Sequence, residues 1–153
     1  MTKRSTEHAT FTIERHYDAA PTRVFAAFAE PAAKARWFGP PESARDEYTL
    51  DFIVGGRERF TVGGPGGATF TYDARYEEIV PDTRIVYAYI LDRDETRVSV
   101  SVATVEVEPA GAGTRLILTS RACSWTAPTR QPSASTARAR CSRSWTACSD
   151  ARR

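Results

Sequence analysis

Apolar and polar residues alternate in short runs from Ser43 to Thr119, and this pattern constrains the fold more than any other feature of the sequence. Between Phe70 and Tyr76, aromatic or small apolar residues occupy every second position, as a half-buried strand requires. Gly-rich and Pro-Asp turns separate this run from its neighbours. Short strands joined by tight turns pair with their neighbours in the chain, so the pattern predicts a meander of about six antiparallel strands.

One more strand and two short helices are expected before the meander. Alternation predicts a strand over about Ala9 to Tyr17. Prolines favour the first position of a helix, which predicts one helix from Pro21 to Ala29 and another from Pro31 to Trp37. The expected class is therefore α+β, a curved antiparallel sheet of about seven strands with two short helices after the first strand.

The valines after residue 97 change phase within one expected strand. Val98, Val100 and Val102 share one phase, whereas Val105 and Val107 share the other. A β-bulge shifts the phase of a strand by one residue, so we expect a bulge near Ala103 and Thr104.

The segment from Ser120 to Arg153 differs in composition from the rest of the chain. It carries seven Arg against a single acidic residue, Asp150, and no Leu, Ile, Val or Phe. Three interpretations remain open: a natural basic tail, a cysteine-bearing metal or disulfide module, and translation in a shifted frame. Cys123, Cys141 and Cys148 form no C-x-x-C pair, which disfavours a zinc site.

The codons of Trp and Thr favour the shifted frame. In the frame that starts one nucleotide earlier, Trp125-Thr126 encodes Leu, Met or Val followed by Asp, and the flanking residues then give the apolar spacing of an amphipathic helix. We therefore expect a flexible leader at residues 1–8, a folded domain at 9–119, and an aberrant basic tail at 120–153 in place of a C-terminal helix.

Four strings of residues resemble a known family in order and spacing. They are Ala19–Phe28, Ala35–Pro41 (Ala-Arg-Trp-Phe-Gly-Pro-Pro, the most specific), Gly55–Phe60 and Gly113–Leu116. They resemble the bacterial proteins similar to activators of the heat-shock-protein-90 ATPase, within the START-like (SRPBCC) superfamily. The resemblance covers about Phe11 to Thr119 and implies a helix-grip fold, in which the sheet wraps a long C-terminal helix around a deep apolar cavity. The basic tail departs from that pattern.

Aromatic residues supply the candidate ligand site. In a START-like cavity such side chains line the pocket, and their hydroxyl groups bond a ligand. The candidates are Trp37, Phe52, Phe60, Phe70, Tyr72, Tyr76, Tyr87 and Tyr89. His16 is the one histidine inside the expected fold and lies on the strand face opposite Ile13, so no catalytic residue, metal ligand or cofactor is predicted.

The leading prediction is a protein that binds a small hydrophobic or aromatic molecule and has no assigned catalysis. An enzyme of the cyclase or hydrolase kind in the same cavity, and a co-chaperone that activates a chaperone ATPase, remain as alternatives. No nucleic-acid partner or membrane span is expected, since the net charge is only +2 and no apolar run is long enough to cross a bilayer. The chain lacks an N-terminal signal pattern, which predicts a cytoplasmic location, and an uncovered sheet face would favour a homodimer.

Overall fold

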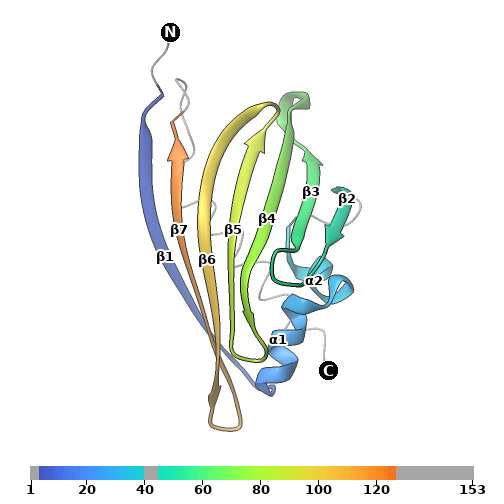
Figure 1. Cartoon of the computed structure of the whole chain (residues 1–153), viewed down its shortest axis with the longest axis vertical. Coiled ribbons are helices and arrows are strands. Elements are labelled where there is room, and N and C mark those ends of the chain that lie inside the picture. Colours follow the sequence, from blue (N-terminus) through green and yellow to red (C-terminus); the bar gives the residue numbers. More distant parts are fainter. Residues whose placement is uncertain (1–3, 40–44, 127–153) are drawn as a thin grey trace.

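The computed structural model describes residues 4–39 and 45–126. These residues form the expected α+β arrangement of one sheet and two short α-helices (Figure 1). In chain order the elements are β1 (Thr6–Tyr17), α1 (Pro21–Ala29), α2 (Pro31–Trp37), β2 (Arg45–Leu50), β3 (Arg57–Gly63), the 3₁₀ turn η2 (Pro65–Gly67), β4 (Thr69–Val80), β5 (Arg84–Arg93), β6 (Thr96–Ala110) and β7 (Gly113–Trp125).

The seven described strands form a single sheet in the order β1-β7-β6-β5-β4-β3-β2. All neighbouring strands are antiparallel, which confirms the meander from β2 to β7. The first strand pairs with the last, and β1 and β2 form the two edges of the sheet (Figure 1).

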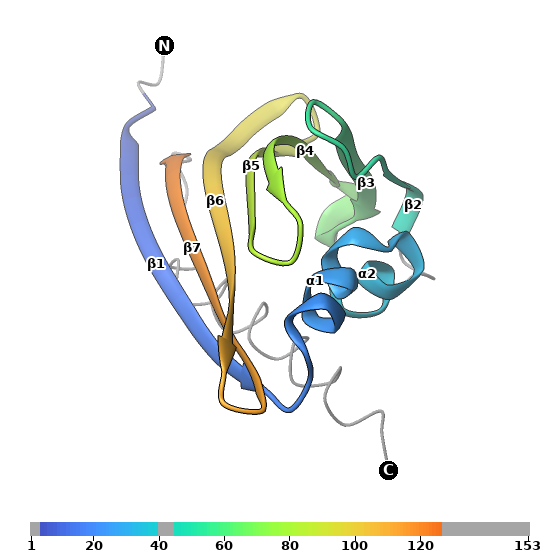
Figure 2. The same cartoon turned by 60° about the horizontal axis from the view of Figure 1, so that its bottom comes forward.

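The sheet is strongly curved, and α1 and α2 lie at one end of its concave side (Figure 2). The core fills the space between these helices and the sheet, and α1 contacts β6 and β7. Its buried hydrophobic residues come from both helices and from the inner face of β3 to β7: Val24, Phe25, Phe28, Trp37, Phe60, Tyr72, Ala74, Tyr76, Ile85, Tyr87, Ala103, Val105, Val107, Leu116 and Leu118.

The two helices begin and end where the prolines and aromatic spacing predict. Pro21 and Pro31 each stand in the first turn, where a missing N–H costs no hydrogen bond. Phe38 caps α2 by donating its backbone N–H to the Lys34 carbonyl oxygen, and Gly39 follows with a φ of 76°, a conformation that favours glycine.

The bulge expected near Ala103 and Thr104 is wrong. The register between β6 and β7 runs without a shift from Ser99 to Ala110, and the one irregularity between β5 and β6 lies at Leu91 and Asp92. Val105 and Val107 face the core, and Val102, which is 50% exposed, lies on the convex face of the same regular strand. The valine phase changes because Ser99, Ser101 and Ala103 occupy the inward-facing positions in the N-terminal half of β6.

The final strand is longer than the composition suggests. We expected the fold to end at Thr119, but β7 continues to Trp125 and pairs there with β1 and β6 on its two sides. Ser120 is buried on the inner face and Arg121 is exposed, so the alternation of a strand persists without large apolar side chains. β1 begins at Thr6 rather than Ala9 because Thr6 pairs with Trp125. The predicted loss of the C-terminal helix, and the homodimer that would follow from it, concern residues outside those described.

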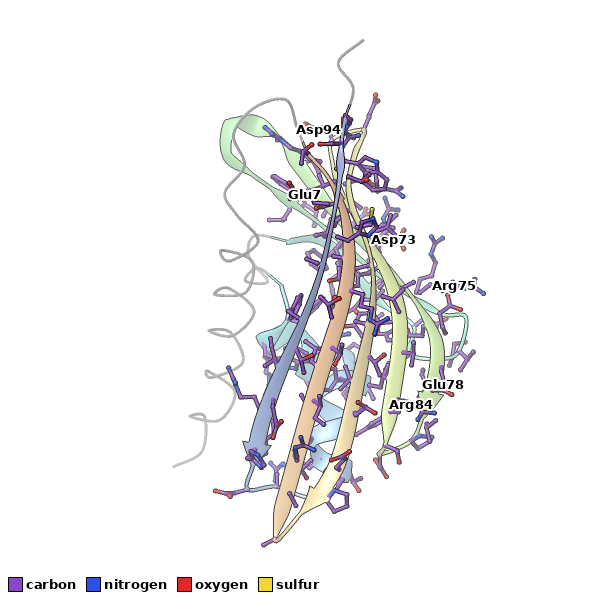
Figure 3. The ribbon with its side chains drawn as sticks, turned by 90° about the vertical axis from the view of Figure 1, so that its left-hand side faces the viewer. Glu7, Asp73, Arg75, Glu78, Arg84 and Asp94 are labelled. Atoms are coloured by element: carbon purple, nitrogen blue, oxygen red, sulfur yellow. The ribbon has the colours of Figure 1, made fainter. Side chains whose placement is uncertain are left out.

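The convex face of the sheet carries charged pairs. Arg84 donates to both carboxylate oxygens of Glu78, at 2.6 and 3.1 Å, and these hydrogen bonds lower the pKa of Glu78. Both residues, together with Arg75, extend from the side of the sheet away from the helices (Figure 3). Such half-exposed pairs are typical of a solvated surface. Within the described part of the chain, neither helix is long and apolar enough to span a membrane.

Candidate functional site

Aromatic side chains form one connected cluster on the concave face. Tyr72 lies near its centre, stacked on Phe60 with ring centroids 5.1 Å apart, and 5.5 Å from Tyr89. Tyr87 lies between Tyr89 and Tyr76, at 5.9 and 5.8 Å. The neighbouring strands β3, β4 and β5 thus contribute one surface of rings, which can pack against a flat apolar molecule.

Seven of the eight aromatic residues named from the sequence lie in this cluster. Phe52 joins it through Tyr76 at 4.9 Å, and Trp37 joins it through Phe38, which contacts both Phe60 and Tyr72. Phe70 lies apart, near the β3–β4 turn, where its ring contacts the Arg93 guanidinium at 5.9 Å. Phe38 was missed because the Gly-Pro-Pro string after it indicated only the end of a helix.

A buried ion pair lies beside the rings. The Lys34 ammonium on α2 is 2.6 Å from a carboxylate oxygen of Glu58 on β3, and the two side chains are 2% and 0% exposed. The Lys34 Nζ also lies 4.9 Å from the Phe38 ring centroid. Burial lowers the pKa of Lys34, and the neighbouring Glu58 carboxylate opposes that shift. The pair as a whole adds no net charge to the site.

Two tyrosine hydroxyl groups complete the pairing of Glu58. Tyr48 donates to Oε1 at 2.8 Å, and Tyr76 donates to Oε2 at 3.1 Å. The Tyr76 oxygen in turn accepts a hydrogen bond from Lys34 at 2.9 Å. Burial and the Glu58 charge raise the pKa of Tyr76 far above its usual value, so its phenol stays protonated. The network fastens α2 and β2 to β3 and β4.

The β2–β3 turn fixes the position of Tyr76. Gly55 donates its backbone N–H to the Tyr76 carbonyl oxygen at 2.7 Å, and Gly56 accepts the Tyr76 N–H at 3.0 Å. A Cβ at Gly56 would lie 2.2 Å from the Asp51 carbonyl oxygen, so the close turn requires glycine there. The glycine pair that indicated a turn in the sequence therefore also helps to build the site.

Lys34 and Glu58 were missed although the sequence carried a signal for both. Lys34 precedes the buried Trp37 by three residues and so shares its helix face. Glu58 precedes Phe60 by two residues and so shares its strand face. A charged residue at each of two core positions indicates a buried pair, because neither charge is stable there alone.

Small hydroxyl side chains continue the concave face beyond the tyrosines. The Tyr89 and Ser120 hydroxyl oxygens lie 3.1 Å apart, and Ser99 and Ser101 are buried on the inner face of β6. This part of the face is therefore more polar than the end beneath α1, where Ile85, Val105 and Leu116 lie.

The His16 side chain on β1 lies away from the concave face. It is 67% exposed and lies beside Glu14, as its strand phase predicts. Residues 4–39 and 45–126 contain no group of three His, Cys, Asp or Glu side chains that could hold a metal ion. The described polar groups are suited to binding by hydrogen bonds.

The curved seven-stranded sheet, the two helices after its first strand and the aromatic concave face define a START-like protein with the helix-grip fold. The family described as "Activator of Hsp90 ATPase homolog 1-like protein" matches residues 18–151. The chain belongs to that family, as the four sequence strings indicated. None of the curated proteins matches it.

Solved bacterial structures share this fold over nearly the whole chain. A protein from Rhizobium leguminosarum is 38% identical with a TM-score of 0.84, over 96% of this chain and 95% of that one. The Mll3558 protein from Rhizobium loti is 36% identical with a TM-score of 0.80, over 94% and 96%. Protein CV1439 from Chromobacterium violaceum is 26% identical with a TM-score of 0.70, over 92% and 94%.

Proposed function

We propose that the chain binds a small hydrophobic or aromatic molecule against the concave face of its sheet. The observation that supports this function is the connected cluster of Phe60, Tyr72, Tyr76, Tyr87 and Tyr89, which combines flat apolar surfaces with several hydroxyl groups. Binding sites for small molecules commonly combine apolar walls with a few placed polar groups.

A ligand that binds only the folded state stabilises it, so thermal unfolding tests the proposal. We expect members of a library of neutral aromatic compounds to raise the midpoint of thermal unfolding as their concentration increases. At a hundred times the Kd, the free energy of unfolding should increase by about 2.7 kcal/mol. Tyr89→Ala should weaken this stabilisation, since it removes a ring from the concave cluster. Val102→Ser, on the convex face, is the matched control and should leave it unchanged. A library without one stabilising compound contradicts the proposal.

Lys34 and Glu58 favour a second candidate, an enzyme of the cyclase or hydrolase kind acting at the same face. A buried lysine with a lowered pKa, held 2.6 Å from a carboxylate, is an arrangement able to transfer protons. Turnover of neutral aromatic esters that is lost in Glu58→Gln and kept in the control Arg36→Met would support it. Absence of turnover in the wild-type chain would remove it.

The family description names an activator of a chaperone ATPase. We therefore also propose, as a separate candidate function, that this chain binds a chaperone and activates its ATPase. Stimulation of the ATPase rate of a purified bacterial chaperone of the heat-shock-protein-90 class measures it directly. An unchanged rate at saturating concentrations of this chain would reject that role.

A further inference from the structure

Tyr72 occupies the most enclosed position in the aromatic cluster. Its side chain on β4 is 5% exposed, and its ring contacts Phe60, Phe38 and Tyr89 at centroid distances of 5.1, 5.1 and 5.5 Å. Rings on three sides hold the phenol in a single orientation.

The Tyr72 hydroxyl is buried and has no hydrogen-bond partner among residues 4–39 and 45–126. Other hydroxyl groups of the cluster are paired within the described residues: Tyr48 and Tyr76 bond to Glu58, and Tyr89 bonds to Ser120. A buried polar atom without a partner costs free energy, and such atoms in folded proteins call for an explanation. A ligand that supplies the missing partner is the explanation consistent with the aromatic surroundings.

The phenol of Tyr72 acts as a donor. Burial raises its pKa well above the ordinary value, and the neighbouring Tyr87 and Glu58 raise it further, so the group remains protonated. A fixed O–H group pairs best with an acceptor oxygen on the ligand.

The charges of the concave face limit the ligand in a second way. Lys34 and Glu58 are the only buried charged residues in the described part of the chain, and they neutralise each other. A charged ligand would therefore be buried without a counter-charge, which is strongly unfavourable.

We propose that Tyr72 anchors an uncharged, flat aromatic ligand by donating a hydrogen bond to one acceptor oxygen of that ligand, such as a ketone or quinone oxygen. This inference rests on the proposed binding function and adds the class of ligand and the residue that selects it. The hydroxyl groups of Tyr48, Tyr76 and Tyr89 bond to other side chains of the protein, whereas the Tyr72 hydroxyl is left for the ligand.

Three naphthalene probes test the inference by calorimetry on the full chain at pH 7. The first is 2-acetylnaphthalene. The second is 2-isopropenylnaphthalene, in which a CH₂ group replaces the ketone oxygen with nearly the same shape. The third is the anion 2-naphthoate. We expect the ketone to bind about five- to ten-fold more tightly than the alkene, the range that one neutral hydrogen bond provides, and 2-naphthoate to bind more weakly than either.

Two variants assign the preference to a residue. Tyr72→Phe should bind ketone and alkene equally, and Tyr89→Phe, whose hydroxyl already bonds to Ser120, should keep the preference for the ketone. If wild-type protein binds neither neutral probe, the proposed function fails and this inference with it. If both bind but without a preference, or if Tyr72→Phe keeps the preference, the inference alone is overturned. Tight binding of 2-naphthoate would overturn the exclusion of charged ligands.

Discussion

Replacing Lys34 with Met tests whether the buried ion pair holds the helices on the sheet. Met keeps much of the length and apolar stem of lysine but removes the charge. Glu58 is fully buried and would retain only the hydrogen bonds from Tyr48 and Tyr76. Removing one partner of a buried pair typically costs about 3–5 kcal/mol, because the remaining charge has no compensation. We expect Lys34→Met to lower the free energy of unfolding by this amount.

The double variant Lys34→Met, Glu58→Gln separates the lost charge from the lost packing. The glutamine is neutral and its oxygen can still accept from a tyrosine hydroxyl, so the double variant should be more stable than Lys34→Met alone. A coupling free energy of about 2 kcal/mol between the two positions is expected, within the range found for residues in contact.

Urea denaturation measures these differences through the midpoint at constant slope. Arg36→Met is the matched control, because Arg36 lies two residues along α2 and is exposed. Its effect should remain within about 0.5 kcal/mol. A cost below about 1 kcal/mol for Lys34→Met, or a double variant as unstable as the sum of the two single ones, would show that the buried ion pair does not hold the helices on the sheet.

Three further substitutions have defined outcomes. Tyr72→Phe should raise the free energy of unfolding by about 1 kcal/mol at pH 8, since it removes a buried hydroxyl that has no partner among the described residues. Because burial raises the pKa of Tyr72 in the folded state, only the unfolded state ionises just above pH 10, and the wild type should lose further stability there relative to the variant. A variant less stable than the wild type at pH 8 would show that the hydroxyl does not destabilise the fold. The Arg115 hydrogen bond lowers the pKa of Glu14 from 4.5 to about 2, so the stabilising contribution of this ion pair is present above pH 4.5 and is lost as the pH falls through 2. In urea denaturation, the difference in stability between wild type and Glu14→Gln should disappear over that interval. A difference that stays constant with pH would argue against the Glu14–Arg115 pair. Gly39→Ala should lower the free energy of unfolding by about 1–2 kcal/mol in the same assay, because φ at this residue is 76° and the new Cβ would lie 3.0 Å from the Phe60 ring. An unchanged midpoint would show that the turn relaxes around the new side chain.

The sequence predicted helices and strands well where their bounds depend only on neighbouring residues. The bounds of α1 and α2 follow from Pro21, Pro31 and the aromatic spacing between them, which depend only on neighbouring residues. The order of β2 to β7 was also predicted, since tight turns force consecutive strands to pair, whereas the position of β1 beside β7 was not. The extension of β7 to Trp125 was not predicted, because it depends on pairing with β1, which lies far away in the sequence.

The candidate site was predicted in part for a similar reason. Tyr72, Tyr76, Tyr87 and Tyr89 were found because strand alternation assigns them to one face. Which hydroxyl groups are paired could not be predicted, since the partners lie on other elements, as Ser120 does for Tyr89. Lys34 and Glu58, by contrast, could have been predicted. The helical and strand periodicity indicates that both side chains are buried, although charged residues usually lie on the surface.

NMR titration of the full chain with 2-acetylnaphthalene tests whether the concave face binds an uncharged aromatic molecule. We expect saturable chemical-shift changes at Tyr72, Tyr89 and Ser101, with little change at Val102 on the convex face. Changes centred on Val102 and its convex neighbours, or no changes at concentrations that saturate binding of such ligands elsewhere, would contradict binding at the concave face.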